Sequence, residues 1–459
     1  MRRVNIVAEL VTLSFFLVGL LVCIVGSFEI LYALIFGLVC FVIYGLIKQH
    51  TKKQMLWMIL DGVKGAKNIL LIFILIGMLT SVWRSAGTIP FLIYHAVSVI
   101  QPDYFVLYMF LLCCLMSLLT GTSFGTAATM GVVCMMIAQS LGINPALSGG
   151  AILAGAYFGD RCSPMSSSAL LVSELTKTNI YDNIRRMFKT SLVPFLATCI
   201  LYLMINPGSG DASLGSAAVE QFQNSFHLSF VVALPAVLII LLSLARINVK
   251  ITMLLSILAG CVLCLTVQKV APMQLLSSLV FGYSSSDPQL AALLNGGGIL
   301  SMSKVFGIIL ISTSYFGIFK KTELLTGITR LVEAAALHIT PFGSVLFTSV
   351  ITSAISCNQT LASMMTFQMC EKIMPDKEKL AITLENTVIV IAPLIPWSIA
   401  GGMPLTTVGA PTVSILFAFY LYLLPLYSLA IELFFHKKGK PIPAAELIEA
   451  ETEEPITKL

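Results

Sequence analysis

Apolar runs that approach the length needed to cross a lipid bilayer recur from one end of this chain to the other. Among its 459 residues, 57% are hydrophobic and 11% are charged. An α-helix needs about 20 apolar residues to cross, and about 17 at the shorter limit. We therefore predict an all-α polytopic membrane protein with about 10–12 transmembrane helices. The runs cover residues 6–25, 30–47, 69–83, 104–119, 188–205, 228–245, 251–267, 299–319, 342–355, 381–395 and 413–435.

The basic residues gather in alternate loops between these runs. Lys52 and Lys53 follow the second run, and Arg185 with Arg186 precedes the fifth, whereas residues 206–226 contain no Lys or Arg. By the positive-inside rule, both termini are cytoplasmic and residues 206–226 form an external linker. The net charge of +5 therefore reflects membrane topology and does not indicate nucleic-acid binding. We expect residues 437–459 to form a cytoplasmic tail.

The chain contains a weak internal repeat. Residues 126–130 (TAATM) align with residues 360–364 (TLASM), and each segment lies in the same order relative to the neighbouring apolar runs. The loop charges give the two copies opposite starting sides, as expected for inverted repeats of secondary transporters. We predict a first repeat at 1–205 and a second, inverted repeat at 227–436, each with a re-entrant hairpin.

Both copies contain a polar interruption after a short apolar run. Thr122, Ser123 and Thr126 belong to the first interruption, and Asn358, Gln359 and Thr360 belong to the second. Paired broken segments of this kind indicate a binding site near the bilayer midplane. Hydroxyl, amide and carbonyl oxygens are suitable ligands for a small hard cation. The alternative is that these small polar residues only bind helices together.

Residues 149–174 place an Asp–Arg pair, a proline and several serines inside an otherwise apolar region. Asp160, Ser163, Ser166 and Ser167 are the candidate binding residues. Ionisable side chains inside a membrane usually mark a substrate or ion pathway. A tight cytoplasmic turn between two helices is the alternative.

A second polar island contains Glu385 and Asn386, six and seven residues beyond Lys379. A carboxylate removed from water favours its protonated form, so Glu385 could exchange a proton. Alternatively, Glu385 lies near the surface and stays hydrated, or it neutralises Lys379 while Asn386 is the ligand. Asp160 is the matching carboxylate of the first half, with Arg161 able to hold it ionised; Glu174 could serve instead, or pair with nearby Lys177.

The sequence contains no motif that predicts an enzyme or a cofactor. Residues 121–125 (GTSFG) fit the pattern of a hydrolase nucleophile, but that pattern requires a strand before it, whereas an apolar helix surrounds it here. No Walker motif, dinucleotide fingerprint or H-E-x-x-H is present. The eleven cysteines lie mostly within apolar runs, where Cys acts as a small hydrophobe.

Three segments together carry a family resemblance: GTSFGTAATMGVV, GAYFGDRCSPMSSS and SAISCNQTLASMMT. In these segments the chain resembles the NhaC-type sodium/proton antiporter family of the ion-transporter superfamily, over about residues 11–434. The resemblance implies exchange of Na⁺ for H⁺ across a bacterial inner membrane, without an enzymatic reaction. It also implies relatives that exchange carboxylates or amino acids on the same fold.

One departure from the family pattern bears on the substrate. The family motif G-D-K-x-S-P-L-S-D-T-T is matched at Asp160, Ser163 and Ser166, but Ser167 replaces its second Asp. The leading hypothesis is a Na⁺/H⁺ antiporter in which Asp160, Thr126 and Asn358 bind Na⁺ transiently. The second is an exchanger of a small organic solute, coupled to Na⁺ or H⁺, with Arg161 among its binding groups. The third is a non-transporting membrane sensor or enzyme. The sequence leaves the oligomeric state open, a homodimer included.

Overall fold

The computed structural model describes residues 2–26, 28–64, 67–99, 102–205, 221–245, 247–287, 290–291, 294–322, 324, 340–356 and 358–436. Most of the predicted external linker and the whole predicted tail, 437–459, lie outside these residues. Within them the chain is almost entirely helical, with one isolated β-bridge between Tyr283 and Gly296. The predicted all-α polytopic fold class is confirmed.

The first half contains the following helices, with the π-helical turn η1 (Ala127–Gly131) between α7 and α8: α1 (Arg2–Val25), α2 (Ile30–Ile47), α3 (Lys52–Lys64), α4 (Lys67–Ser85), α5 (Thr88–Val99), α6 (Pro102–Thr120), α7 (Ser123–Thr126), α8 (Val132–Ser140), α9 (Pro145–Cys162), α10 (Ser167–Thr176) and α11 (Ile180–Ile205).

The second half contains the following helices, of which η2 to η5 are 3₁₀-helical: η2 (Phe230–Ala233), α13 (Leu234–Leu244), α14 (Val249–Thr266), α15 (Pro272–Phe281), η3 (Ile299–Met302), α17 (Ser303–Thr322), α19 (Pro341–Ser356), α20 (Gln359–Cys370), α21 (Lys377–Asn386), α22 (Val388–Ile391), η4 (Ala392–Leu394), α23 (Ile399–Val408), η5 (Thr412–Phe417) and α24 (Phe419–His436).

Four helical segments in the described part of the chain are long and apolar enough to cross a membrane, and two bent pairs raise that number to six. The segments are 102–120, 123–140, 180–205 and 299–319, and the bent pairs join 70–85 to 88–95 and 377–394 to 399–408. The remaining apolar helices are shorter, with 10–17 residues. The expected total of about 10–12 crossings stays a prediction.

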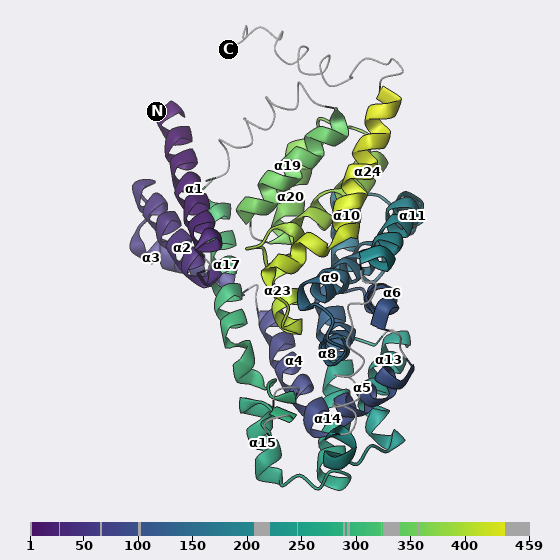
Figure 1. Ribbon diagram of the computed structural model, residues 1–459. Helices are drawn as coiled ribbons and strands as arrows, with labels where there is room; N and C mark the ends of the chain where they lie inside the picture. Colours follow the sequence, from purple (N-terminus) through teal and green to yellow (C-terminus); the bar gives the residue numbers. More distant parts are fainter. Residues whose placement is uncertain are drawn as a thin grey trace, which may run out of the picture.

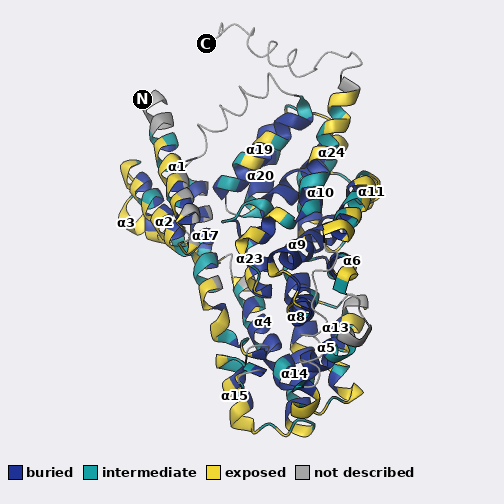
Figure 2. Cartoon of the chain, in the orientation of Figure 1, coloured by how far each residue is buried: buried dark blue, intermediate teal, exposed yellow. Residues whose placement is uncertain are grey.

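Helices α1, α2, α3 and α17 form one side of the molecule, and α9 lies inside the other part, between α6, α10, α23 and α24 (Figure 1). Helix α1 begins and α24 ends at the same end of the molecule (Figure 1). The outer surfaces of α1, α2 and α3 are exposed and rich in apolar side chains, whereas α8 and α9 are buried (Figure 2). A large exposed apolar surface of this kind is stable when it is in contact with the hydrocarbon chains of lipids.

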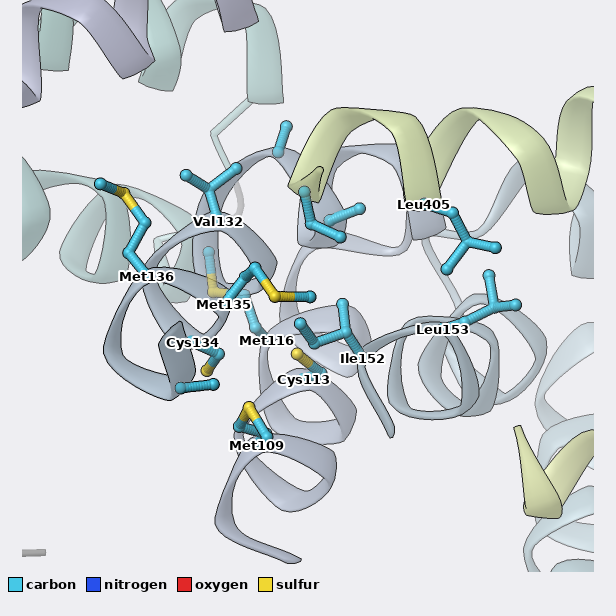
Figure 3. Close-up of a cluster of buried hydrophobic side chains, with 14 of the residues drawn as sticks. Met109, Cys113, Met116, Val132, Cys134, Met135, Met136, Ile152, Leu153 and Leu405 are labelled. Atoms are coloured by element: carbon cyan, nitrogen blue, oxygen red, sulfur yellow. The ribbon is translucent and has the colours of Figure 1, made fainter. Parts of the chain in front are cut away.

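The close contact between α6 and α9 depends on two glycines four residues apart. A Cβ atom on Gly155 would lie 2.6 Å from the Phe110 carbonyl oxygen, and one on Gly159 would lie 2.3 Å from the Leu118 nitrogen. Small residues at this spacing allow two membrane helices to approach closely. Side chains of α6, α8 and α9, among them Cys113, Met135 and Ile152, fill the adjacent core (Figure 3). This contact holds the end of α9, and with it Asp160, in the interior.

Candidate functional site

Asp160 lies in the last turn of α9, with only 4% of its surface exposed. Its two carboxylate oxygens accept hydrogen bonds from Ser166 Oγ at 3.2 Å and from Ser168 Oγ at 3.0 Å. Ser166 is also the N-cap of α10, where its hydroxyl accepts the backbone N–H groups of Ser168 and Ala169. The break between α9 and α10 therefore turns the start of α10 toward the carboxylate, which excludes a simple surface turn at Asp160.

Both polar interruptions lie near Asp160. Ser123 and Gln359 are close enough to act on its carboxylate electrostatically, and the Gln359 amide donates its hydrogen bond to the Ile389 carbonyl at 3.0 Å. Ser123 begins α7, and Gln359 begins α20. Helix N-termini carry partial positive charge, so the starts of α7, α10 and α20 all favour a negative charge near Asp160. That the two interruptions face each other across a binding site stays a prediction.

The two interruptions have nearly the same backbone geometry. Thr122 caps α7 with φ −149° and ψ 126°, and Asn358 caps α20 with φ −146° and ψ 127°. The Asn358 carboxamide accepts the Thr360 N–H at 2.9 Å, and the Thr122 hydroxyl accepts the Gly125 N–H at 3.4 Å. If the two interruptions are copies of one repeat, this geometry pairs Thr122 with Asn358, two residues away from the pairing of Thr126 with Thr360 in the sequence alignment. The repeat itself stays a prediction.

Arg161 is completely buried and does not pair with its neighbour Asp160. Its Nε donates to the main-chain carbonyl of Glu385 at 3.1 Å. Its other donors reach neutral oxygens of α11, α21 and α24, namely those of Thr190, Ser191, Asn386 and Tyr420. No ion pair of Arg161 is found among the described residues. Arg161 therefore does not hold Asp160 ionised through an ion pair in the described structure, because its guanidinium donates to other partners.

Glu385 is fully buried in the last turn of α21, so the reading of a hydrated surface residue is wrong. Neither of its carboxylate oxygens has a hydrogen-bond partner. The charged groups that act on it electrostatically are Arg161 and Asp160. Lys379 is exposed at the start of α21 and is not one of them, so the suggested neutralisation of Lys379 is wrong as well. An unpartnered carboxylate in the interior is costly, and such groups usually have a functional explanation.

Both the oxygen and the nitrogen of the Asn386 carboxamide, next to Glu385, form hydrogen bonds. Its oxygen accepts from Arg161 Nη2, and its nitrogen donates to Ser428 Oγ at 3.1 Å. The helix is interrupted directly afterwards, at Thr387, where φ is −120° and ψ is −87°. Asn386 therefore connects Arg161 to α24 beside the break.

Other predicted residues lie apart from the Asp160 carboxylate or have their oxygens engaged elsewhere. Ser163 is buried, but its hydroxyl donates to the Leu118 carbonyl at 2.8 Å. Thr126 bonds to Thr120 and to the Thr122 carbonyl within its own segment. Ser167, Glu174 and Thr360 are exposed. Ser167 is the first residue of α10 and is exposed, whereas its neighbours Ser166 and Ser168 donate to Asp160.

The sequence analysis missed several residues of the site. Ser168 takes the place that was predicted for Ser167, because Ser166 caps the helix and Ser168 then turns inward. Thr190, Ser191 and Tyr420 hold Arg161. In the sequence these three residues stand out only as polar residues within apolar helices. Polar residues at such positions also mediate ordinary helix packing, so the sequence alone does not identify them as partners of Arg161.

The sequence model of the Na⁺/H⁺ antiporter family matches this chain at residues 4–173 and 155–436, which together include every element of the site. The chain belongs to the Na⁺/H⁺ antiporter family. The family resemblance seen in the three motif segments is thereby confirmed.

Individual relatives in this family carry different names at almost the same identity. The Na⁺/H⁺ antiporter NhaC of Alkalihalophilus pseudofirmus is 29% identical over 381 residues, which is 80% of this chain and 82% of the relative. The malate-2H⁺/Na⁺-lactate antiporter of Bacillus subtilis is 28% identical over 418 residues, which is 87% of this chain and 89% of the relative. The arginine/ornithine antiporter ArcD of Halobacterium salinarum is 28% identical over 372 residues, which is 77% of this chain and 76% of the relative. All three are antiporters, so the family points to transport rather than to an enzyme.

Proposed function

We propose that this protein exchanges Na⁺ for H⁺ across a bacterial cell membrane by alternating access. The observation that carries the proposal is the carboxylate of Glu385, which is fully buried and has no hydrogen-bond partner on either oxygen. A buried negative charge of this kind is stable only when a cation or a proton neutralises it. Asp160 provides a second carboxylate close enough to interact with it.

The charges of the site favour one monovalent cation at a time. Asp160 and Glu385 contribute two negative charges when both are ionised, and Arg161 contributes one positive charge. One Na⁺ or one H⁺ then brings the buried site to neutrality, so the two ions compete. Carboxylate oxygens are hard ligands that suit Na⁺. The amide of Asn358 and the hydroxyl of Thr126 are occupied by local hydrogen bonds, so we assign them to holding the interruptions rather than to binding the ion.

Exchange of an organic solute is the second candidate, because two of the named relatives are solute antiporters. The bonding of Arg161 disfavours an organic anion. Its guanidinium is already saturated by five oxygen acceptors from the protein, so it has no free donor for a substrate carboxylate. Two buried carboxylates suit a solute with an ammonium group better.

We also propose the inverted-repeat topology, with repeats at 1–205 and 227–436 and both termini in the cytoplasm. The matching caps at Thr122 and Asn358 support the repeat. The start of α3 that carries Lys53 and the end of α17 that carries Lys321 line one cavity, so these basic residues lie on the same side, as the positive-inside rule requires.

The decisive experiment uses purified protein in proteoliposomes that contain a pH-sensitive dye and no organic solute. An inward Na⁺ gradient should drive proton efflux in the wild type, and K⁺ at the same concentration should not. Proton movement that requires a carboxylate or an amino acid on the opposite side would instead establish the solute exchanger.

A further inference from the structure

A cavity of about 460 Å³ lies between the α2–α3 turn and the end of α17, and Trp57 forms part of its wall. The cavity shares no lining residue with the site around Asp160 and Glu385. Its lining includes His50 and Lys53 from the turn and the first turn of α3, and Lys321 from the last turn of α17. We propose that this cavity binds the phosphate headgroup of an anionic phospholipid at the membrane surface.

The cavity has more positive than negative charge. Lys53 is exposed and His50 is half-buried, and neither forms an ion pair within the described residues. Lys321 has one acidic neighbour, Asp61, whose carboxylate oxygen is 4.0 Å from its ammonium nitrogen. A single pair at that distance and exposure is weak, so an anion in the cavity would still be attracted.

The start of α3 adds partial positive charge at the cavity. Thr51 and Gln54 form a reciprocal cap, in which the Thr51 N–H donates to Gln54 Oε1 at 2.8 Å and the Gln54 N–H donates to Thr51 Oγ1 at 3.3 Å. This cap orders the start of the 13-residue helix at the cavity, where the helix dipole favours an anion. The Lys321 ammonium lies 3.6 Å above the Trp57 ring, which fixes it at the cavity wall.

The surroundings distinguish a lipid headgroup from a free phosphate ion. The exposed face of α2 is apolar as far as Ile47, which is 67% exposed, and the first charge after it is Lys48. On α3, beyond the cavity-lining residue Gln54, Leu56 and Leu60 are 57% and 50% exposed. The boundary between the lipid-facing surface and the basic groups therefore passes through the cavity. Basic pockets at this depth bind anionic headgroups, while the adjacent apolar surface receives the acyl chains.

The test compares thermal unfolding of purified protein in phosphatidylcholine nanodiscs with and without phosphatidylglycerol. Phosphatidylglycerol should raise the wild-type Tm, and the double variant Lys53→Gln/Lys321→Gln should lose at least half of that shift. The control is Lys189→Gln, an exposed basic residue of α11 outside the cavity, which should keep the full shift. Each shift is measured against the same variant in pure phosphatidylcholine, so that a change in basal stability is subtracted.

Two results would overturn the proposal. The first is an equal phosphatidylglycerol shift in the double variant and the wild type. The second is the same shift on adding inorganic phosphate or glycerol phosphate to pure phosphatidylcholine nanodiscs, which would identify a free-anion site. If the double variant does not fold, Lys53→Gln alone is decisive, because Lys53 is exposed and makes no ion pair in the described structure. An unreduced shift in that single variant would also contradict the proposal.

Discussion

Arg161 Nε donates a hydrogen bond to the main-chain carbonyl of Glu385 at 3.1 Å, while the carboxylate of the same glutamate has no hydrogen-bond partner. The guanidinium therefore fixes the backbone beside the break at Thr387 without occupying the acidic side chain. Its positive charge still acts on Glu385 through space. In this arrangement Arg161 lowers the cost of a buried negative charge and leaves both carboxylate oxygens available to an ion.

Asp160→Asn should abolish Na⁺-driven proton movement while the protein still inserts and folds. The amide keeps the shape of the carboxylate and removes the charge that the hydroxyls of Ser166 and Ser168 stabilise. Dye-based transport in proteoliposomes measures the loss, and size-exclusion chromatography checks folding. Glu174→Gln is the matched control, because Glu174 is exposed on α10. Normal transport by Asp160→Asn would remove this residue from the mechanism.

Ser168→Ala should weaken Na⁺ binding, whereas Ser167→Ala should not. Ser168 donates to the Asp160 carboxylate at 3.0 Å, and Ser167 is exposed. A hydrogen bond to a charged group contributes about 1.5–3 kcal/mol, so the KM for Na⁺ should rise by about tenfold or more. Equal effects of the two variants would contradict the register of α10 found here.

The two carboxylates of the site could be predicted from the sequence because charged residues are rare within the apolar runs. Asp160, beside Arg161, and Glu385 are conspicuous for that reason, and the two interruptions were visible as polar segments in the apolar sequence. The all-α membrane fold likewise followed from the recurrence of apolar runs. These features depend on local composition, which one sequence shows directly.

The details that depend on helix starts and on distant contacts could not be predicted. The choice of Ser168 over Ser167 depends on which serine caps α10, and Ser166, Ser167 and Ser168 are equally plausible caps by residue type. The partners of Arg161 come from three other helices, up to 259 positions away in the chain. The short interval between Asp160 and Arg161 suggested a pair, but successive residues on a helix point in different directions.

Arg161→Lys should destabilise the protein strongly. The planar guanidinium of Arg161 donates hydrogen bonds to α11, α21 and α24 at the same time. A lysine ammonium has three donors on a flexible side chain and cannot form all of these bonds. Disruption of a buried charged network costs about 3–5 kcal/mol, and a large fall in Tm should result. Arg186→Lys is the control, because its ion pair with Glu378 is exposed and should contribute about 0–1 kcal/mol. A stable Arg161→Lys protein that loses only solute-dependent transport would favour a substrate-binding role for Arg161.

Gly159→Ala should lower stability through the contact between α6 and α9. The new Cβ would lie 2.3 Å from the Leu118 nitrogen, so the helices would have to separate. Overpacking of this kind costs about 1–3 kcal/mol. Gly402→Ala in α23 is the control, since the nearest atom there is 3.7 Å away. Similar Tm values for the two variants would show that α6 and α9 are not in such close contact.

Glu385→Gln should abolish most of the exchange, and any residual transport should no longer depend on pH. In the wild type, lowering the pH protonates the buried carboxylate and excludes Na⁺, so the KM for Na⁺ should rise as the pH falls. A glutamine can neither bind the proton nor neutralise Na⁺, so this competition disappears.

Asn386→Ala separates ion binding from support of Arg161. Asn386 accepts from Arg161 and donates to Ser428, so its removal should lower Tm while the residual transport keeps the wild-type pH profile. Both variants are measured across the same pH series in proteoliposomes of equal protein content. If Glu385→Gln kept the wild-type pH profile and Asn386→Ala abolished transport in a stable protein, the roles of these two residues would be reversed.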